Sequence, residues 1–99
     1  MKMTTLAILG LVLSMPAMAS EELAKAKNCM TCHALNKKIV GPSYQEIAAK
    51  RSGEKGAEAA LAAKIKKGSK DEWGKVPMPA NQVTDAEAAT LAKWVLSIK

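Results

Sequence analysis

The chain has 99 residues, of which 15 are basic and 9 are acidic, and its formal net charge is +6. This length is sufficient for one domain. The basic residues are distributed along the chain and only Tyr44, Trp73 and Trp94 are aromatic, which argues against a nucleic-acid-binding arm and against the stacking of bases. So few aromatic side chains also supply little bulk for a core, and we expect another group to fill the centre of the domain.

The N-terminal segment has the pattern of a secretory signal peptide. Lys2 is followed by an apolar run over residues 6–13 and by the small-residue segment Ala17-Met18-Ala19. The run is shorter than the ~20 residues that a membrane-spanning helix needs, so a retained anchor is the less favoured alternative. We predict a cleaved signal peptide over residues 1–19 and an exported, periplasmic domain over residues 20–99. That domain has 80 residues and a net charge of about +5.

Four helices and no strand are predicted, because the apolar residues recur every three or four positions rather than every two. The fold class is therefore all-α. The first helix is expected to run from about Glu21 into the Cys29 region, with Ser20 or Glu21 at its start. Its buried side is expected to hold Leu23, Ala24 and Ala26.

The second and fourth helices each have a clear start signal. Ser43-Tyr44-Gln45-Glu46 and Thr84-Asp85-Ala86-Glu87 both have the Ser/Thr-x-x-Glu spacing of a capping box, in which two side chains satisfy free backbone N–H groups. The second helix is expected to begin after Pro42 and to stop at residues 51–53. The fourth is expected to bury one face, formed by Ala88, Leu91, Val95 and Ile98.

The third helix is predicted over residues 57–67. Leu61 and Ile65 lie one turn apart, and Gly68 occupies the position past the C-terminal end that favours glycine. Residues 69–83 have no helical period and contain one glycine and two prolines. An irregular segment of this length is uncommon in a small domain and is usually functional.

The segment Cys29-Met30-Thr31-Cys32-His33 has the Cys-x-x-Cys-His spacing of covalent haem attachment. Two thiols three positions apart can each form a thioether with a vinyl group of the same porphyrin. The imidazole of His33 then projects to the haem iron as an axial ligand. We therefore predict one haem c, bound covalently through Cys29 and Cys32.

Other uses of these cysteines are weaker explanations. A disulfide is the default for cysteines in an exported protein, but one that closes so short a loop constrains the unfolded chain very little. A redox-active Cys-x-x-Cys motif needs a βαβ context and leaves His33 without a role. A structural zinc site needs four ligands, whereas the chain has two cysteines and one histidine.

The second axial ligand of the iron follows by elimination. With one histidine, a two-histidine haem is impossible within one chain, and residues 20–99 contain two methionines. Met30 lies between the two thioether cysteines and does not reach the opposite face, which leaves Met78, between Pro77 and Pro79. Without the haem motif, a loop methionine that packs on the core would be the more common explanation.

An iron with both axial positions filled has no site for oxygen or substrate. The expected function is therefore that of an electron carrier and not of an enzyme. The alternative is a haem-based sensor or a peroxidase-like module in which the sixth ligand, Met78, is displaceable.

A set of ordered motifs connects this site to the rest of the chain. They are Cys29-Met30-Thr31-Cys32-His33, Val40-Gly41-Pro42, Ile65-Lys66-Lys67-Gly68, Trp73-Gly74, Val76-Pro77-Met78-Pro79 and Leu91-Ala92-Lys93-Trp94-Val95-Leu96. Together they resemble the short bacterial class I monohaem cytochromes c, most closely the five-fifty-one and five-fifty-two type. The resemblance covers essentially all of residues 20–99 and implies the class I cytochrome c fold, with four to five short helices wrapped around one covalently bound haem.

The resemblance implies three further contacts at the haem. The Pro42 carbonyl would accept a hydrogen bond from the second ring nitrogen of His33. Asn81 would donate to the Met78 sulfur, and the Trp73 indole would donate to a haem propionate. Taken alone, Trp73 is equally well explained by core packing, and Asn81 is better explained as a residue of a loop-to-helix turn.

The chain departs from the family pattern at two places. Ala80 stands where a second proline often follows the Met-Pro pair, and Lys70-Asp71-Glu72 precede Trp73 where small, neutral residues are usual. These departures concern local stability and surface charge more than iron ligation. Lys64, late in the third helix, is either a solvated side chain or a partner for a propionate.

The resemblance also implies redox partners in a respiratory chain. These are acidic-surfaced proteins such as a nitrite reductase, a terminal oxidase, a cytochrome c peroxidase or a membrane cytochrome complex. We expect transient docking at the haem edge, no nucleic-acid binding, no stable membrane insertion and a monomeric protein. A mostly solvated basic surface is expected from Lys25, Lys27, Lys37, Lys38, Lys66, Lys67, Lys70 and Lys75.

Overall fold

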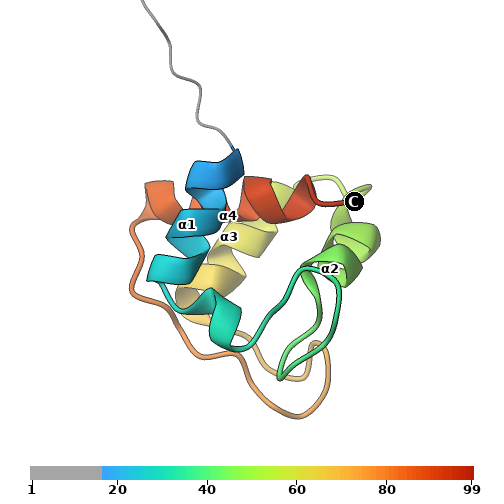
Figure 1. Cartoon of the computed structure of the whole chain (residues 1–99). Helices are drawn as coiled ribbons and strands as arrows, with labels where there is room; N and C mark the ends of the chain where they lie inside the picture. Colours follow the sequence, from blue (N-terminus) through green and yellow to red (C-terminus); the bar gives the residue numbers. More distant parts are fainter. Residues whose placement is uncertain (1–16) are drawn as a thin grey trace, which may run out of the picture.

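The computed structural model describes residues 17–99, and side chains from Ser20 onward. This part of the chain forms four α-helices and one 3₁₀ turn, with no strand, which confirms the all-α class (Figure 1). Two isolated β-bridges join His33 to Lys38 and Ser69 to Met78. The elements are α1 (Ala17–Ala26), η1 (Cys29–Thr31), α2 (Tyr44–Arg51), α3 (Ala57–Lys67) and α4 (Asp85–Leu96).

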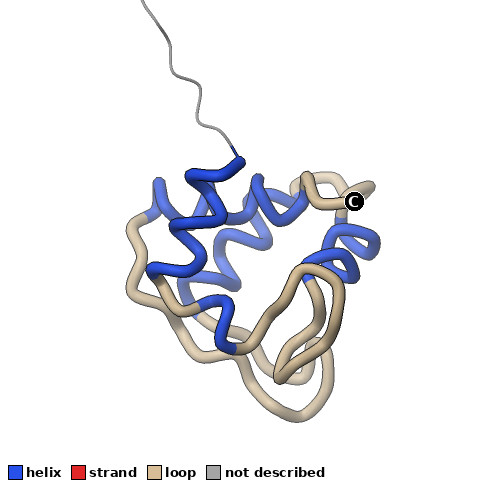
Figure 2. The backbone as a smooth tube through the Cα atoms, in the orientation of Figure 1, coloured by secondary structure: helices blue, strands red, loops and turns tan. Residues whose placement is uncertain are grey.

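Helix α4 is the element on which the other helices pack. It contacts α1, α2 and α3, and Leu91 and Ala92 on its surface are 2% and 0% exposed. Full burial of a leucine side chain contributes about 1.5–3 kcal/mol of stability. The two long connections lie together on one side of the helices, as the loop segments in Figure 2 show. The buried core consists of Ala24, Tyr44, Ile47, Ile65, Ala88, Leu91, Ala92, Trp94 and Val95.

Helix α1 begins earlier than the sequence predicts. The helix already includes Ala17, the first described residue, and thus extends before the expected start at Ser20 or Glu21, over alanine and methionine residues that favour a helix. It ends at Ala26, and Asn28 adopts a left-handed conformation (φ 65°) that separates it from η1. Cleavage after Ala19 stays a prediction; most of the predicted signal peptide lies outside the described residues.

The expected burial of Ala26 was wrong. Ala26 is exposed, whereas Ser20 and Ala24 are buried and Leu23 is partly buried. Ser20 and Ala24 are four positions apart and share one face of the helix, while Ala26 is rotated to the opposite face. The apolar stripe of α1 is therefore narrow, and small residues in it allow a close approach to α4.

The capping boxes predicted for α2 and α4 are both present. Ser43 Oγ accepts a hydrogen bond from Glu46 N (3.0 Å), and Glu46 Oε1 accepts from Ser43 N (3.2 Å). The same reciprocal pair joins Thr84 and Glu87, at 3.0 and 2.9 Å. Each box satisfies two of the four free N–H groups at a helix start. Local sequence therefore determines where these two helices begin.

The remaining predictions for the helices hold with one change. Helix α3 has the predicted bounds and is followed by Gly68. Helix α4 buries Ala88, Leu91 and Val95 as expected, but ends at Leu96, so that Ile98 packs against the core from beyond the helix. Within residues 17–99 no helix is long and apolar enough to cross a membrane.

The long irregular segment is closed by backbone hydrogen bonds at its base. Ser69 N donates to Met78 O (3.0 Å), and Met78 N donates to Ser69 O (2.8 Å). At its far end, Asn81 donates from both its backbone and its side-chain nitrogen to the carbonyl of Ile65 (3.3 and 2.9 Å). That carbonyl is one of the last four of α3, which lack partners within the helix. The segment is thus closed on itself at Met78 and tied to α3 through Asn81.

Gly68 allows this closure. Its φ is +87°, and a Cβ built there would lie 2.6 Å from the carbonyl oxygen of Met78. We predict that Gly68→Ala lowers the free energy of unfolding by about 2 kcal/mol, from backbone strain and the clash together. Chemical denaturation of the intact protein measures this change. Gly53→Ala is the control, because a Cβ at Gly53 meets nothing within 4 Å, and an equal loss in both variants would contradict the explanation.

Candidate functional site

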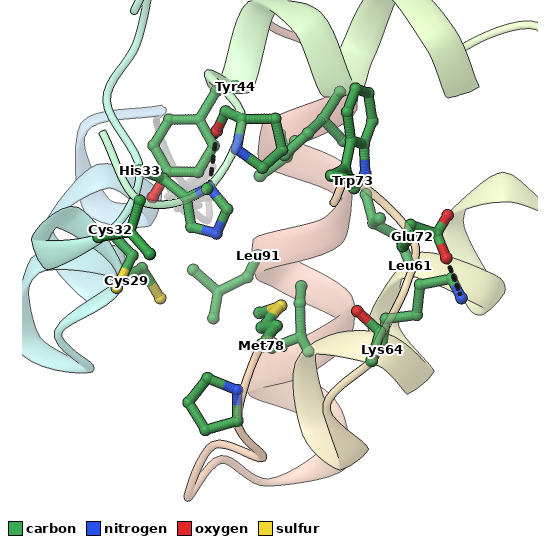
Figure 3. A pocket seen from close by; sticks show the side chains of 18 of the residues that line it. Cys29, Cys32, His33, Tyr44, Leu61, Lys64, Glu72, Trp73, Met78 and Leu91 are labelled. Atoms are coloured by element: carbon green, nitrogen blue, oxygen red, sulfur yellow. Dashed lines mark hydrogen bonds and ion pairs between the residues drawn. The ribbon is translucent and has the colours of Figure 1, made fainter. Parts of the chain in front are cut away.

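A pocket opens between the helices and the two long connections (Figure 3). All four α-helices contribute to its wall, for example Ala24 from α1, Ile47 from α2, Leu61 from α3 and Leu91 from α4. Most of the remaining lining comes from residues 29–42 and 69–79. The apolar core of the domain is therefore built around a hollow, as the shortage of aromatic side chains predicts.

The two cysteines lie together at one end of the pocket. Both Cys29 and Cys32 line it, both are free thiols, and Figure 3 shows their sulfur atoms side by side. The tight turn of η1, with Cys32 N and His33 N both donating to Cys29 O (3.2 and 3.0 Å), sets this arrangement. Burial raises the pKa of the Cys29 thiol above its usual value, so that the thiol before attachment is neutral at pH 7.

The ring of His33 is fixed by its neighbours on the same connection. Its Nδ1 lies 2.7 Å from the carbonyl oxygen of Pro42, the contact that the resemblance implies. Nδ1 therefore carries the proton and donates, and Nε2 is left with a free lone pair. A Cβ built on Gly41 would lie 2.7 Å from His33 Cε1, so the backbone at Gly41 packs directly on the imidazole.

Tyr44 is a site residue that sequence reasoning missed. Its ring lies 5.4 Å from that of His33, centroid to centroid, and contacts Trp94 edge to face at 5.0 Å. Its hydroxyl donates to the sulfur of Met30 (3.4 Å), and burial raises its pKa, which keeps it protonated. The sequence did contain a signal for this role. Tyr44 is an aromatic residue in the first turn of the helix that follows Gly41-Pro42, and it is therefore close in the chain to a segment that contacts His33.

Met78 lies across the pocket from His33. Both residues line the same pocket, and Figure 3 shows Met78 on one side of it and His33 on the other. The sulfur of Met30 is instead engaged by Tyr44. The structure therefore places a thioether donor, Met78 Sδ, and an imidazole donor, His33 Nε2, on opposite sides of the same pocket.

Asn81 is placed differently from what the resemblance implies. Its side-chain nitrogen donates to Ile65 O (2.9 Å) and to Pro79 O (3.4 Å), so this amide ties the connection to α3. This is the turn role that the sequence alone favoured. Donation from Asn81 to the Met78 sulfur stays a prediction.

Trp73 lines the pocket at the end away from the cysteines. The ammonium group of Lys50 lies over its ring, 4.6 Å from the centroid, a distance at which a cation is attracted to an aromatic face. Beside it, Lys64 forms an ion pair with Glu72 (2.9 Å). Donation from the Trp73 indole to a propionate stays a prediction.

The donor set of the pocket fits a covalently attached haem. Two thiols at one end can form the two thioethers, apolar walls can receive the macrocycle, and imidazole and thioether donors flank it on opposite sides. Within residues 17–99 there is no cluster of three or more His, Cys, Asp and Glu side chains that could hold a metal ion.

The contact between Gly41 and His33 gives a test of this geometry. We predict that Gly41→Ala displaces the imidazole, because the new methyl group occupies space within 3.3 Å of three ring atoms. The expected cost is about 1–3 kcal/mol in the free energy of unfolding, the usual range for overpacking, together with shifted ring resonances of His33 in NMR spectra. Unchanged stability and unchanged resonances would contradict the packing described here.

Comparison with known proteins extends these observations. The cytochrome c family model matches residues 17–99. Cytochrome c-551 of Pseudomonas aeruginosa is 58% identical over 79 residues, covering 80% of this chain and 76% of the relative. Cytochrome c-552 of Hydrogenobacter thermophilus is 58% identical over 81 residues, covering 82% and 83%.

Solved structures agree with the sequence comparison. Wild-type cytochrome c552 of Nitrosomonas europaea superposes with a TM-score of 0.78 at 48% identity, covering 80% of this chain and 99% of that one. The class 1 cytochrome MtoD of Sideroxydans lithotrophicus superposes with a TM-score of 0.72 at 28% identity, covering 86% and 98%. The fold, the cysteine pair and these relatives together show that the chain belongs to the cytochrome c family, the electron-transfer proteins that carry one covalently attached haem.

Proposed function

We propose that this protein is a periplasmic electron carrier in which His33 and Met78 are the axial ligands of the haem iron. The observation that carries the proposal is the placement of these two side chains on opposite sides of one pocket, with both cysteines at its end. In this proposal residues 1–19 are a signal peptide that is removed on export.

The residues around the pocket have distinct roles in such a carrier. The haem supplies the one-electron ferric/ferrous couple. The carbonyl of Pro42 accepts a hydrogen bond from Nδ1–H of His33 and so orients Nε2. The ring of Tyr44 packs against the same imidazole. The Ser69 pairing fixes the backbone of Met78. Because a thioether is a soft ligand, Met78 favours the ferrous state and raises the reduction potential relative to a second histidine.

The rim of the pocket has the character of a transient docking surface. Val40 and Val76 line the pocket and are also 47% and 67% exposed. Lys38 and Lys70 line the same pocket and are exposed. An apolar centre with positive side chains around it fits a partner with an acidic docking face.

Three lysines of the predicted basic surface are paired with carboxylates. Lys25, Lys27 and Lys66 form ion pairs with Glu21, Glu87 and Asp85, and such solvent-exposed pairs contribute little to stability. Members of the family act with redox-protein partners. For this chain we propose acidic respiratory partners of four kinds, namely a nitrite reductase, a terminal oxidase, a cytochrome c peroxidase or a membrane cytochrome complex, that dock at the rim.

Replacement of the proposed sixth ligand tests the function directly. We predict that Met78→Ala loses the charge-transfer absorption of sulfur-ligated ferric iron and that its ferrous form binds carbon monoxide at neutral pH, since an axial position opens. The parent protein is expected to bind none. Met30→Leu is the matched control, because Met30 is the other methionine of residues 20–99 and its sulfur contacts Tyr44.

Two results would contradict the assignment. The first is an unchanged spectrum in Met78→Ala, which would mean that another group ligates the iron. The second is carbon monoxide binding by the parent protein, which would favour a haem-based sensor or a peroxidase-like module over a carrier.

The docking surface predicts a defined salt dependence. The rate of oxidation of the ferrous protein by ferricyanide, an anionic acceptor, is expected to fall as ionic strength rises, because salt screens the attraction to the rim. Lys70→Gln is expected to lower the rate at low salt more than Lys25→Gln, since Lys25 is not part of the pocket lining. Stopped-flow kinetics measure these rates. Equal effects of the two substitutions would place the docking surface elsewhere.

A further inference from the structure

Three charged side chains form a cluster that the proposed function does not use. Glu72 forms ion pairs with Arg51, through Oε2 and Nη2, and with Lys64, at 2.9 Å. The cluster joins the last residue of α2, a late residue of α3 and the irregular connection. The side chains of Glu72 and Arg51 are only 17% and 18% exposed, and that of Lys64 is 35% exposed.

The cluster lies at the end of the pocket opposite the cysteines. Figure 3 shows Glu72 and Lys64 beside Trp73, on the far side of the pocket from Cys29 and Cys32. The vinyl groups and the two propionates of a haem are carried on opposite edges of the macrocycle. Thioethers at the cysteine end therefore direct the propionates toward the cluster.

The charge of the lining is strongly asymmetric. Four of its side chains are basic (Lys38, Arg51, Lys64 and Lys70), and Glu72 is the one carboxylate among the described residues that line it. Ferric haem carries one more positive charge than ferrous haem. Basic side chains around the pocket therefore favour reduction, and a carboxylate opposes it.

We propose that Glu72 is an internal counter-anion that lowers the reduction potential of the haem by neutralising Arg51 and Lys64 at the propionate end of the pocket. The inference rests on the proposed function, since it places a ligated haem between His33 and Met78. Glu72 acts here as a positioning residue. It holds two cations that would otherwise both be directed at the propionates. This role also accounts for a carboxylate directly before Trp73, where the family pattern has a small, neutral residue.

The decisive variant is Glu72→Gln in the intact, haem-loaded protein. It removes one negative charge while keeping an amide oxygen of the same reach for Arg51 and Lys64. The equilibrium constant for reduction is expected to rise about threefold, the order expected for one partly screened charge. That factor is an upward shift of about 30 mV in a one-electron couple, at about 59 mV per tenfold. Spectroelectrochemical titration measures the potential.

Two further variants separate charge from structure. Glu54→Gln is the matched control, because Glu54 also pairs with Arg51 (3.2 Å) but is 44% exposed and lies outside the pocket lining. The reduction potential of Glu54→Gln is expected to differ from that of the parent protein by only a small fraction of the shift in Glu72→Gln. Glu72→Asp keeps the charge with a shorter reach, and its potential is expected to stay close to that of the parent protein.

The outcomes distinguish this inference from the proposed function. A reduction potential that falls or does not change in Glu72→Gln would overturn the inference. Equal shifts in Glu72→Gln and Glu72→Asp would also overturn it, because a purely structural role of Glu72 would not distinguish the two variants. Chemical denaturation of each variant gives the structural contribution separately. If the parent protein lacks sulfur-to-iron charge-transfer absorption, the proposed ligation fails. If that absorption is intact in every variant and the potentials are equal, only the role of Glu72 fails.

Discussion

A folded chain of about 80 residues with three aromatic side chains has little bulk with which to close a core on itself, and the pocket at its centre is consistent with that constraint. Helix α4 packs on the other three helices along one side. Leu91 and Val95 belong at once to this buried core and to the wall of the pocket. A haem held in the pocket would thus be part of the core, and we expect its attachment and the folding of the chain to be coupled.

The two proposed axial ligands come from irregular connections, yet each is held by backbone contacts. His33 is fixed by the Pro42 carbonyl and by the close approach of Gly41. Met78 is fixed by two hydrogen bonds to Ser69 and by the close approach of Gly68. Rigid placement of ligands suits a redox centre whose two oxidation states should differ little in geometry.

Features encoded by neighbouring residues were predictable from the sequence. The capping boxes at Ser43 and Thr84 and the end of α3 before Gly68 all depend on side chains within four positions of each other. The Cys-x-x-Cys-His motif is equally local, and so it predicts the cysteine end of the pocket without any knowledge of the fold.

Features that depend on distant residues were mostly not predictable from the sequence pattern, and the contact between His33 and Pro42 was implied only by the family resemblance. The pairing of Ser69 with Met78, the packing of Tyr44 on His33 and the bond from Asn81 to Ile65 span 9 to 16 positions. The ion pair of Arg51 with Glu72 joins residues that are 21 positions apart. Hydrophobic periodicity carries no information on such contacts, because it reports only which face of an element is buried.

The paired backbone hydrogen bonds between Ser69 and Met78 have a consequence for how such a protein can evolve. On the proposed ligation, these bonds hold the backbone of Met78 in place, and opening of the connection at its base is one route by which the sulfur would leave the iron. A few substitutions at the base of the connection, remote from the iron, would raise the population of the open state. On the proposed ligation, the stability of this connection would therefore contribute, together with the chemistry of the ligand, to whether the sixth position of the iron stays closed.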